Sequence, residues 1–135
     1  MNLHEKITAR LDELEALVKA VGVGRWAIQE FRGDDFAVTW ESTGYAAADA
    51  FRRETAALIA AVASPDVVLR QVTEDRDVLK RHRPSAEPVR TPLGDHTVCV
   101  YCSDLNGVEV RVVGWPCWDA ISLARRHGID HGEAG

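Results

Sequence analysis

The sequence has no long hydrophobic run and no excess of positive charge. No stretch approaches the roughly 18 consecutive apolar residues of a membrane-spanning helix, and the first residues lack the basic and then apolar regions of a secretory signal. The formal net charge is -5 at pH 7, which argues against a surface built throughout to neutralise phosphates. We therefore expect a cytoplasmic protein without a membrane partner, in which any nucleic-acid binding is local.

Proline and cysteine are also scarce. The 135 residues include 5 prolines, whereas 46% of the chain is hydrophobic and 27% is charged, a balance typical of folded globular proteins. A chain of this length fits one domain of ordinary size, so we expect residues 1–135 to form a single domain. The 3 cysteines are an odd number, which in a reducing compartment favours metal or redox chemistry over a disulfide scaffold.

Catalytic and nucleotide-binding motifs are absent as well. The chain contains no H-E-x-x-H, G-x-S-x-G or P-loop pattern. The stretch GVG at 22–24 follows a helical pattern rather than a strand, so it indicates a helix end, and Asp34-Asp35 is typical of a turn. No residue is therefore assigned a catalytic role, and a non-enzymatic function is favoured.

The N-terminal residues predict a long amphipathic helix. Apolar residues recur at helical spacing over 3–21, and Asn2 with Glu5 forms a capping-box pattern at the start. The apolar face of this helix is broad. The pattern leaves open whether the core covers that face or a second copy of the chain does, so homodimerisation is one expectation.

The pattern then changes from helix to strand and back. Residues 26–31 and 36–41 alternate as the two strands of a hairpin that turns near 33–34. Helical spacing returns from Ala46 and ends near Ala63, and a further helix is predicted over 65–82.

After residue 82 the chain first becomes proline-rich. Residues 83–95 hold three prolines and almost no large apolar side chains, which predicts a semi-extended loop. Two β-branched runs follow in 96–102 and 108–113, and Asn106-Gly107 between them favours a tight hairpin turn. The stretch WPCWDAISLARRHG then predicts a last helix. The expected α+β fold thus comprises a body of helices and a hairpin over 1–82, a loop over 83–95, a zinc-bound hairpin with a helix over 96–128, and a tail over 129–135.

All three cysteines lie in the last third of the chain. Cys99 and Cys102 form a C-x-x-C pair at a predicted strand end, and Cys117 begins the last helix. Many small zinc sites combine such a knuckle with a ligand at a helix N-terminus, because both the metal and the helix dipole favour thiolates there. A closed tetrahedral site needs a fourth ligand. A second C-x-x-C would place that ligand at position 120, which is Ala120.

The 5 histidines are the other source of a fourth ligand, and their positions rank them. His127 lies ten residues along the last helix from Cys117, roughly 15 Å away, which excludes it if the helix is continuous. His96 and Cys99 lie an odd number of positions apart on one predicted strand, so their side chains point to opposite faces and His96 is the weaker candidate. His131 could reach the site only if the tail folded back, and nothing marks His4, which lies in the first turn of a distant helix. His82 ends the third helix and precedes a loop long enough to reach the cysteines. His82 is therefore the predicted fourth ligand.

The order of these motifs resembles an uncharacterised family of small actinobacterial and actinophage proteins, a domain of unknown function. The stretch SPDVVLRQVTEDRDVLKRHRP is similar to a helix of that family written DPxxVLRxVxAxRxxLxxHxP, and the C-x-x-C and WPC segments are similar to its CxxC…(W)PCxTxRxLA pattern. The resemblance covers about residues 46–126 and implies a zinc-binding set of three cysteines and one histidine. The matching residues are Arg70, His82, Cys99, Cys102 and Cys117.

The chain departs from the family pattern in two places. Trp118-Asp119 follows Cys117 where the family has Thr-x-Arg, and the tail lacks the usual aromatic ending of the family. The resemblance implies no activity.

Other interpretations of the same residues stay open. Free cysteine is among the most buried residue types, so three thiols can pack as small hydrophobes without metal. A redox C-x-x-C pair usually opens a helix of a βαβ unit, whereas this pair ends a predicted strand. His82 can also act only as a cation at a helix C-terminus.

Basic residues form the remaining candidate site. They cluster at 80–83 and 124–127, in last helical turns where positive side chains are expected without any ligand. If a metal drew these segments together, they would form a basic surface near exposed Trp115 or Trp118 that suits nucleic acid. The candidate residues are Lys80, Arg81, Arg83, Arg90, Arg125 and Arg126.

Two hypotheses for function follow. The leading one is a small intracellular protein stabilised by structural zinc, related to phage or prophage, that acts as a protein-interaction module on an unidentified partner. The alternative is a nucleic-acid-binding protein that uses the basic surface around the zinc site.

Overall fold

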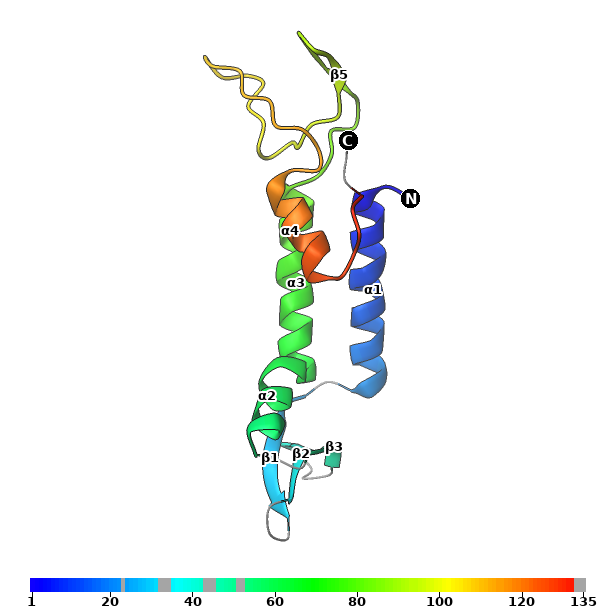
Figure 1. The fold of residues 1–135 in the computed structure, drawn as a ribbon, viewed down its shortest axis with the longest axis vertical. Coiled ribbons are helices and arrows are strands. Elements are labelled where there is room, and N and C mark those ends of the chain that lie inside the picture. The colour runs from blue at the N-terminus through cyan, green and yellow to red at the C-terminus, as the bar shows by residue number, and fades with distance from the viewer. Residues whose placement is uncertain (23, 32–34, 43–45, 51–52, 133–135) are drawn as a thin grey trace. The chain divides into compact units, whose positions relative to one another are not determined.

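In the residues that it describes, the computed structural model contains four helices and two antiparallel sheets, which confirms the predicted α+β class (Figure 1). The structure describes residues 1–22, 24–31, 35–42, 46–50 and 53–132. The chain divides into two compact units. We call Glu13–Thr73 the central unit, and Met1–Asp12 with Glu74–Gly135 the terminal unit. No helix in the described ranges has both the length and the apolar character of a membrane span.

Helix α1, Leu3–Val21, is the first helix that the sequence predicts. Its start is a capping box, because the Asn2 side chain accepts a hydrogen bond from the Glu5 N–H at 2.9 Å and the Glu5 carboxylate accepts one from the Asn2 N–H at 2.8 Å. In the terminal unit, Ile7 and Leu11 of this helix are fully buried. The core therefore covers the apolar face of its first turns.

The central unit has a three-stranded sheet with one helix packed on it. The strands β1 (Trp26–Phe31), β2 (Asp35–Trp40) and β3 (Ala46–Ala50) are antiparallel in the order β1-β2-β3, and α2 (Arg53–Ala63) packs against β1 and β2. Val38 and Ala56 are fully buried between sheet and helix, and the half-buried side chains around them are Trp26, Ile59 and Ala60. This is an ordinary apolar core.

The hairpin of β1 and β2 is confirmed, and its turn near 33–34 lies outside the described residues. The helix predicted to start at Ala46 is wrong over its first residues, because Ala46–Ala50 forms β3 and the helix starts at Arg53. Alanine is the best helix former, so the run AAADA favours a helix by propensity. Here, pairing with β2 satisfies its backbone groups and overrides that preference.

The helix predicted over 65–82 is confirmed as α3, Pro65–Arg81. The last helix is confirmed as α4, Trp118–Arg126. Its end is a Schellman motif: Gly128 has φ 66, and the Ile129 N–H donates to the Ala124 carbonyl at 2.9 Å. A positive φ of this kind is where glycine avoids the strain of a Cβ atom.

The proline-rich stretch is not a plain loop. It contains the hairpin of β4 (Val89–Thr91) and β5 (Gly94–His96), so the loop prediction is wrong for these residues. The Thr91 hydroxyl bonds the Gly94 carbonyl at 2.8 Å, and Gly94 turns the chain with φ 112. Proline at a hairpin turn removes no ladder hydrogen bond, which is why its presence did not prevent the strands.

The second predicted hairpin, of 96–102 with 108–113, is also wrong as a regular ladder. Isolated bridges join Val98 to Gly114 and Asp104 to Arg111, and one partner of each bridge lies outside the two predicted runs. No tight turn forms at Asn106-Gly107, because the Asp104 carboxylate accepts hydrogen bonds from both of their N–H groups, at 3.2 and 2.9 Å. The local Asp104 side chain therefore organises a wider loop.

Candidate metal centre

Three short segments of the terminal unit lie side by side and form the scaffold of the site. Pro84 bridges Cys99 on one side, where the Val100 N–H donates to the Arg83 carbonyl at 3.0 Å. On the other side the Cys99 N–H donates to the Val113 carbonyl at 2.8 Å. Cys99 therefore lies in the middle segment, with the end of α3 on one flank and the chain leading to α4 on the other.

Each of the four candidate ligands is fixed by local structure. His82 follows the last residue of α3, and its N–H still bonds the Val78 carbonyl at 2.8 Å. Cys99 and Cys102 belong to a tight turn closed by the Ser103 N–H on the Cys99 carbonyl at 3.0 Å. Cys117 is the N-cap residue of α4. The backbone of these segments thus directs all four side chains toward one place.

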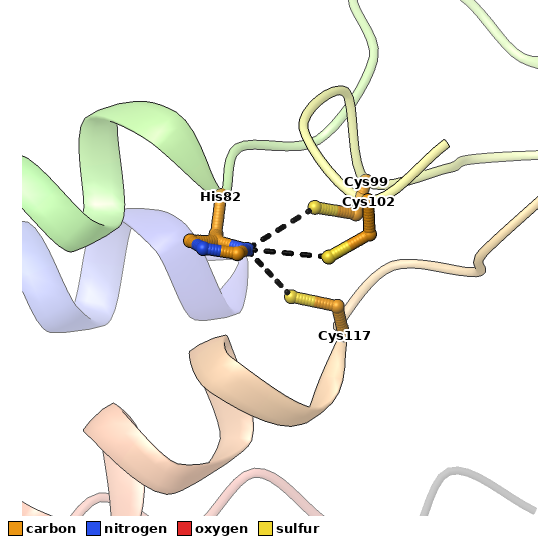
Figure 2. A group of neighbouring side chains, drawn as sticks. All are labelled: His82, Cys99, Cys102 and Cys117. Carbon is orange, nitrogen blue, oxygen red and sulfur yellow. Dashed lines mark hydrogen bonds between the residues drawn. The ribbon is translucent and has the colours of Figure 1, made fainter. Parts of the chain in front are cut away.

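The four side chains converge on one point. The His82 Nδ1 atom lies 3.8, 3.3 and 3.5 Å from the Sγ atoms of Cys99, Cys102 and Cys117 (Figure 2). All four ligand atoms lie within 4.8 Å of one another. A ring nitrogen carries at most one proton, so it cannot donate hydrogen bonds to three sulfurs at once. The arrangement is that of ligands around a shared centre, and the group could hold a metal ion.

The cluster is largely buried, and the pKa values of two of its thiols are raised. Cys99, Cys117 and His82 are exposed by 0%, 3% and 8%. The pKa of the Cys102 thiol is raised to about 12, mainly by desolvation and further by the neighbouring Cys99 and Cys117 sulfurs. Burial also raises the pKa of Cys117, while the Ala120 backbone acts in the opposite direction. Three thiolates in so small a space repel one another unless a cation lies among them.

Two side chains lie at the rim of the cluster. Tyr101, in the turn between Cys99 and Cys102, is 60% exposed, and its ring centre lies 4.7 Å from that of His82. Asp119, in the first turn of α4, has one carboxylate oxygen 3.6 Å from His82 Nδ1, and its side chain is 56% exposed. Both contact the ligand imidazole while remaining open to solvent.

The other ranked histidines lie elsewhere in the terminal unit. His96 ends β5 on the surface, where its Nε2 atom lies 3.3 Å from the Leu93 carbonyl oxygen. His127 is the C-cap of α4, and its Nε2 atom lies 2.8 Å from Asp75. Neither belongs to the cluster. The histidine that lies beside the three cysteines is His82, which the sequence analysis selected, and not the weaker candidate His96.

The Asp75 contact is one that sequence reasoning missed. Asp75 is 1% exposed, and its two carboxylate oxygens bond Arg126 at 2.5 Å and His127 at 2.8 Å, which joins α3 to the end of α4. The signal was present, because Asp75 occurs at helical spacing with Val72 and Leu79, both buried. A carboxylate on the inward face of a helix indicates a buried cationic partner.

The basic candidates are only partly brought together. Lys80, Arg81 and Arg83 line one hollow of about 740 Å³ with Tyr101, Val100 and Asp77. The remaining three are placed differently. Arg90 lies in β4, Arg125 lies over the Trp118 ring at 5.6 Å, and Arg126 is paired with Asp75.

Comparison of the chain with protein-family models, with curated proteins and with solved structures gave no match in any of the three. The chemistry of the site itself therefore carries the functional argument.

Proposed function

We propose that His82, Cys99, Cys102 and Cys117 bind one structural Zn²⁺ ion. Three thiolates and one imidazole are among the common closed ligand sets of zinc. Bond lengths of about 2.3 Å for Zn–S and about 2.0 Å for Zn–N, at a tetrahedral angle, place nitrogen and sulfur roughly 3.5 Å apart. The observed separations of 3.3 to 3.8 Å bracket that value.

A closed set of four ligands supports a stabilising role rather than catalysis. Catalytic zinc keeps a position for water or substrate, and here the protein supplies all four donors. The ion would join the end of α3, the turn of Cys99 and Cys102, and the start of α4. The buried cluster that these segments share consists of the small residues Cys99, Cys117 and Ala120.

The function that we propose for this zinc-stabilised scaffold is protein interaction. Most of the large apolar side chains that are exposed in the described ranges lie between residues 93 and 118. They are Leu93, Val100, Tyr101, Leu105, Val108, Val110, Val112 and Trp118. Leu93 and Val112 line one hollow together, and Val100 and Tyr101 line another. Exposed apolar side chains that lie together are typical of a protein-binding site. This concentration is the observation that carries the proposal.

A phage or prophage origin and a cytoplasmic location form part of the same proposal. Their support is the similarity of the α3 sequence and of the cysteine pattern to the small actinobacterial and actinophage family, together with three cysteines that form no disulfide. Reduced thiols and zinc–thiolate sites are typical of reducing compartments.

Metal analysis of purified native protein tests the zinc site. We expect one zinc per chain in the wild type and in His96→Ala, and little or none in His82→Ala. The His96 variant is the matched control, because it also removes an imidazole from the same region of the terminal unit. Equal zinc in both variants would remove His82 from the ligand set.

Site-specific photo-crosslinking in the native cell tests protein interaction. A photoreactive residue at Val110, which is 65% exposed, is expected to form covalent adducts with protein. The same residue at Leu17, 57% exposed on α1, is the matched control and should form few. Absence of protein adducts at Val110 and at Trp118 would refute the proposed function.

Nucleic-acid binding is the second candidate, and the basic hollow favours it. Lys80, Arg81 and Arg83 surround exposed Tyr101, and the Arg81 guanidinium lies 5.8 Å from the Tyr101 ring centre. Proteins that bind single-stranded nucleic acid typically combine cations with an exposed aromatic ring, because the cations contact phosphates and a base stacks on the ring. We would measure binding of single-stranded and duplex oligonucleotides over a salt series. Affinity that falls steeply with salt and is lost in Arg83→Ala supports this candidate, and no binding at low salt removes it.

A further inference from the structure

The segment Val108–Val112, sequence VEVRV, has the sequence pattern of a strand, but the chain bends at Val108 and Glu109 and only Arg111 of the segment forms a bridge. The Arg111 N–H and carbonyl both bond Asp104 at 2.8 Å. Two further residues at every second position, Val113 and Trp115, bond in the same direction. The Val113 carbonyl accepts a hydrogen bond from the Cys99 N–H, and the Trp115 N–H donates one to the Thr97 carbonyl. The backbone groups of 111, 113 and 115 therefore all face the segment 97–104.

Backbone groups alternate in direction along an extended chain, so those of Val110 and Val112 face the opposite edge. For Val108, Val110 and Val112 the structure records no backbone hydrogen bond to any other described residue. Their side chains are exposed too, by 65% at Val110 and 42% at Val112, and completely at Val108. An unpaired edge with β-branched side chains is a template for pairing with another chain.

We propose that this edge pairs with the same segment of a second copy of the chain, in antiparallel orientation. The inference rests on the protein-interaction function proposed above and names its partner. A two-fold axis at Val110 places Val110 opposite its own copy and Val108 opposite the partner's Val112. The backbone groups of Val110 and Val112 face outward, whereas the chain bends at Val108 and Glu109. Pairing would straighten these two residues, so that each such pair can exchange two hydrogen bonds.

Charge complementarity favours a second copy as the occupant. In this register Glu109 of each copy lies opposite Arg111 of the other, so the symmetric pairing creates two ion pairs across the strands. Neither side chain has an ion-pair partner among the described residues. A shift of the axis to Val112 would place Arg111 opposite Val113 and lose both pairs, so the charges also fix the register.

The surroundings of the edge have room for the incoming strand. Val112 lines a hollow of about 850 Å³ whose wall also includes Leu93 of the β4–β5 turn and Trp115. Leu93 is 89% exposed. In the proposed register Val108 of the second copy lies beside Val112, where it can also contact the exposed Leu93 side chain. Pairing would thus bury side chains that the single chain leaves in water.

Charge exchange at these two positions tests the proposal on purified, metal-loaded protein. We expect the wild type to dimerise in sedimentation experiments between micromolar and millimolar concentration. Glu109→Arg and Arg111→Glu each place like charges opposite one another, so each should weaken the dimer about tenfold or more. Mixing the two variants should restore dimers, because one chain then carries arginine at both positions and the other carries glutamate at both. The double variant E109R/R111E should dimerise alone, because each of its pairs again joins an arginine to a glutamate.

The outcomes separate this inference from the function on which it rests. A monomeric wild type, or single variants that dimerise as well as the wild type, would overturn the self-pairing. Crosslinking at Val110 to a protein of another mass would still support protein interaction in that case. Zinc content and helical circular dichroism are expected to be unchanged in the variants, because both side chains are exposed. Unchanged values would show that a lost dimer does not result from unfolding.

Discussion

The central unit and the terminal unit are held together by different chemistry. In the central unit Val38 and Ala56 form an apolar core between a sheet and α2. Around the candidate metal site of the terminal unit, the buried cluster consists of Cys99, Cys117 and Ala120, with the half-buried Cys102, Val113 and Trp115 packed against it. Ligands that converge on one ion can order segments that bury little apolar surface. Under the proposed function, the valines and aromatic rings that such segments leave exposed would contact a partner.

Metal removal should produce the largest difference between the two units. We expect chelation under reducing conditions, or Cys99→Ser, to abolish amide protection around Cys99 and Cys117 while Val38 and its neighbours stay protected. Structural zinc contributes roughly 10 to 16 kcal/mol in zinc-finger peptides, more than such a segment gains from packing. Hydrogen exchange followed by mass spectrometry measures this. Equal loss in both units, or no loss in either, would contradict the comparison.

Asp75→Ala should have the next largest effect, in the terminal unit. The change leaves His127 and Arg126 without the carboxylate that joins α4 to α3, which we expect to cost about 3 kcal/mol of unfolding free energy. Urea denaturation of the metal-loaded protein measures it. Glu74→Ala, at the exposed neighbouring position, is the control and should change stability by less than about 0.5 kcal/mol. Similar values for both variants would show that the buried contact does not stabilise the unit.

Val38→Ala tests the apolar core of the central unit. Removing two methyl groups from a fully buried valine should cost about 2 kcal/mol and loosen the sheet of the central unit. Zinc content should stay at the wild-type value, because the ligands belong to the terminal unit. Val62→Ala, at a position 60% exposed on α2, is the control. A variant that lost zinc together with the sheet would show that the two units depend on each other.

Asp119→Asn should have the smallest effect. The carboxylate lies near His82 but is 56% exposed, and an exposed charge contributes little, so zinc affinity should change less than about fivefold. Competition with a colorimetric chelator measures the affinity. A loss comparable to that of His82→Ala would instead identify Asp119 as a ligand.

The sequence alone predicted the four residues of the cluster for local reasons. The rise of a helix placed His127 too far from Cys117, and α4 is continuous as that argument requires. The argument against His96 assumed one strand from His96 to Cys99, whereas β5 ends at His96. The structure places both histidines outside the cluster. The long helices α1 and α3 were predicted for local reasons too, since their caps and apolar spacing lie within a few residues of one another.

Features that depend on distant partners were missed. The strand β3 exists because β2 offers it a ladder, and the alanine run by itself favours a helix. The segment 108–113 has the composition of a strand, yet its single bridge to Asp104 leaves the other edge open. Asp75 on α3 has its partners 51 and 52 positions further along the chain. Helical spacing places Asp75 on the inward face of α3 but does not identify partners at that distance along the chain.

What the sequence by itself determined is which residues can serve as ligands and which elements carry them, because helix rise, strand alternation and thiol chemistry act over short distances. Only the tertiary structure decided that three sulfurs meet one imidazole, that Asp75 anchors α4, and that the VEVRV edge stays unpaired. Contacts between remote segments set these positions: backbone hydrogen bonds join the segments of the site, and the Asp75 carboxylate joins α3 to α4. Spacing along the sequence does not identify such partners.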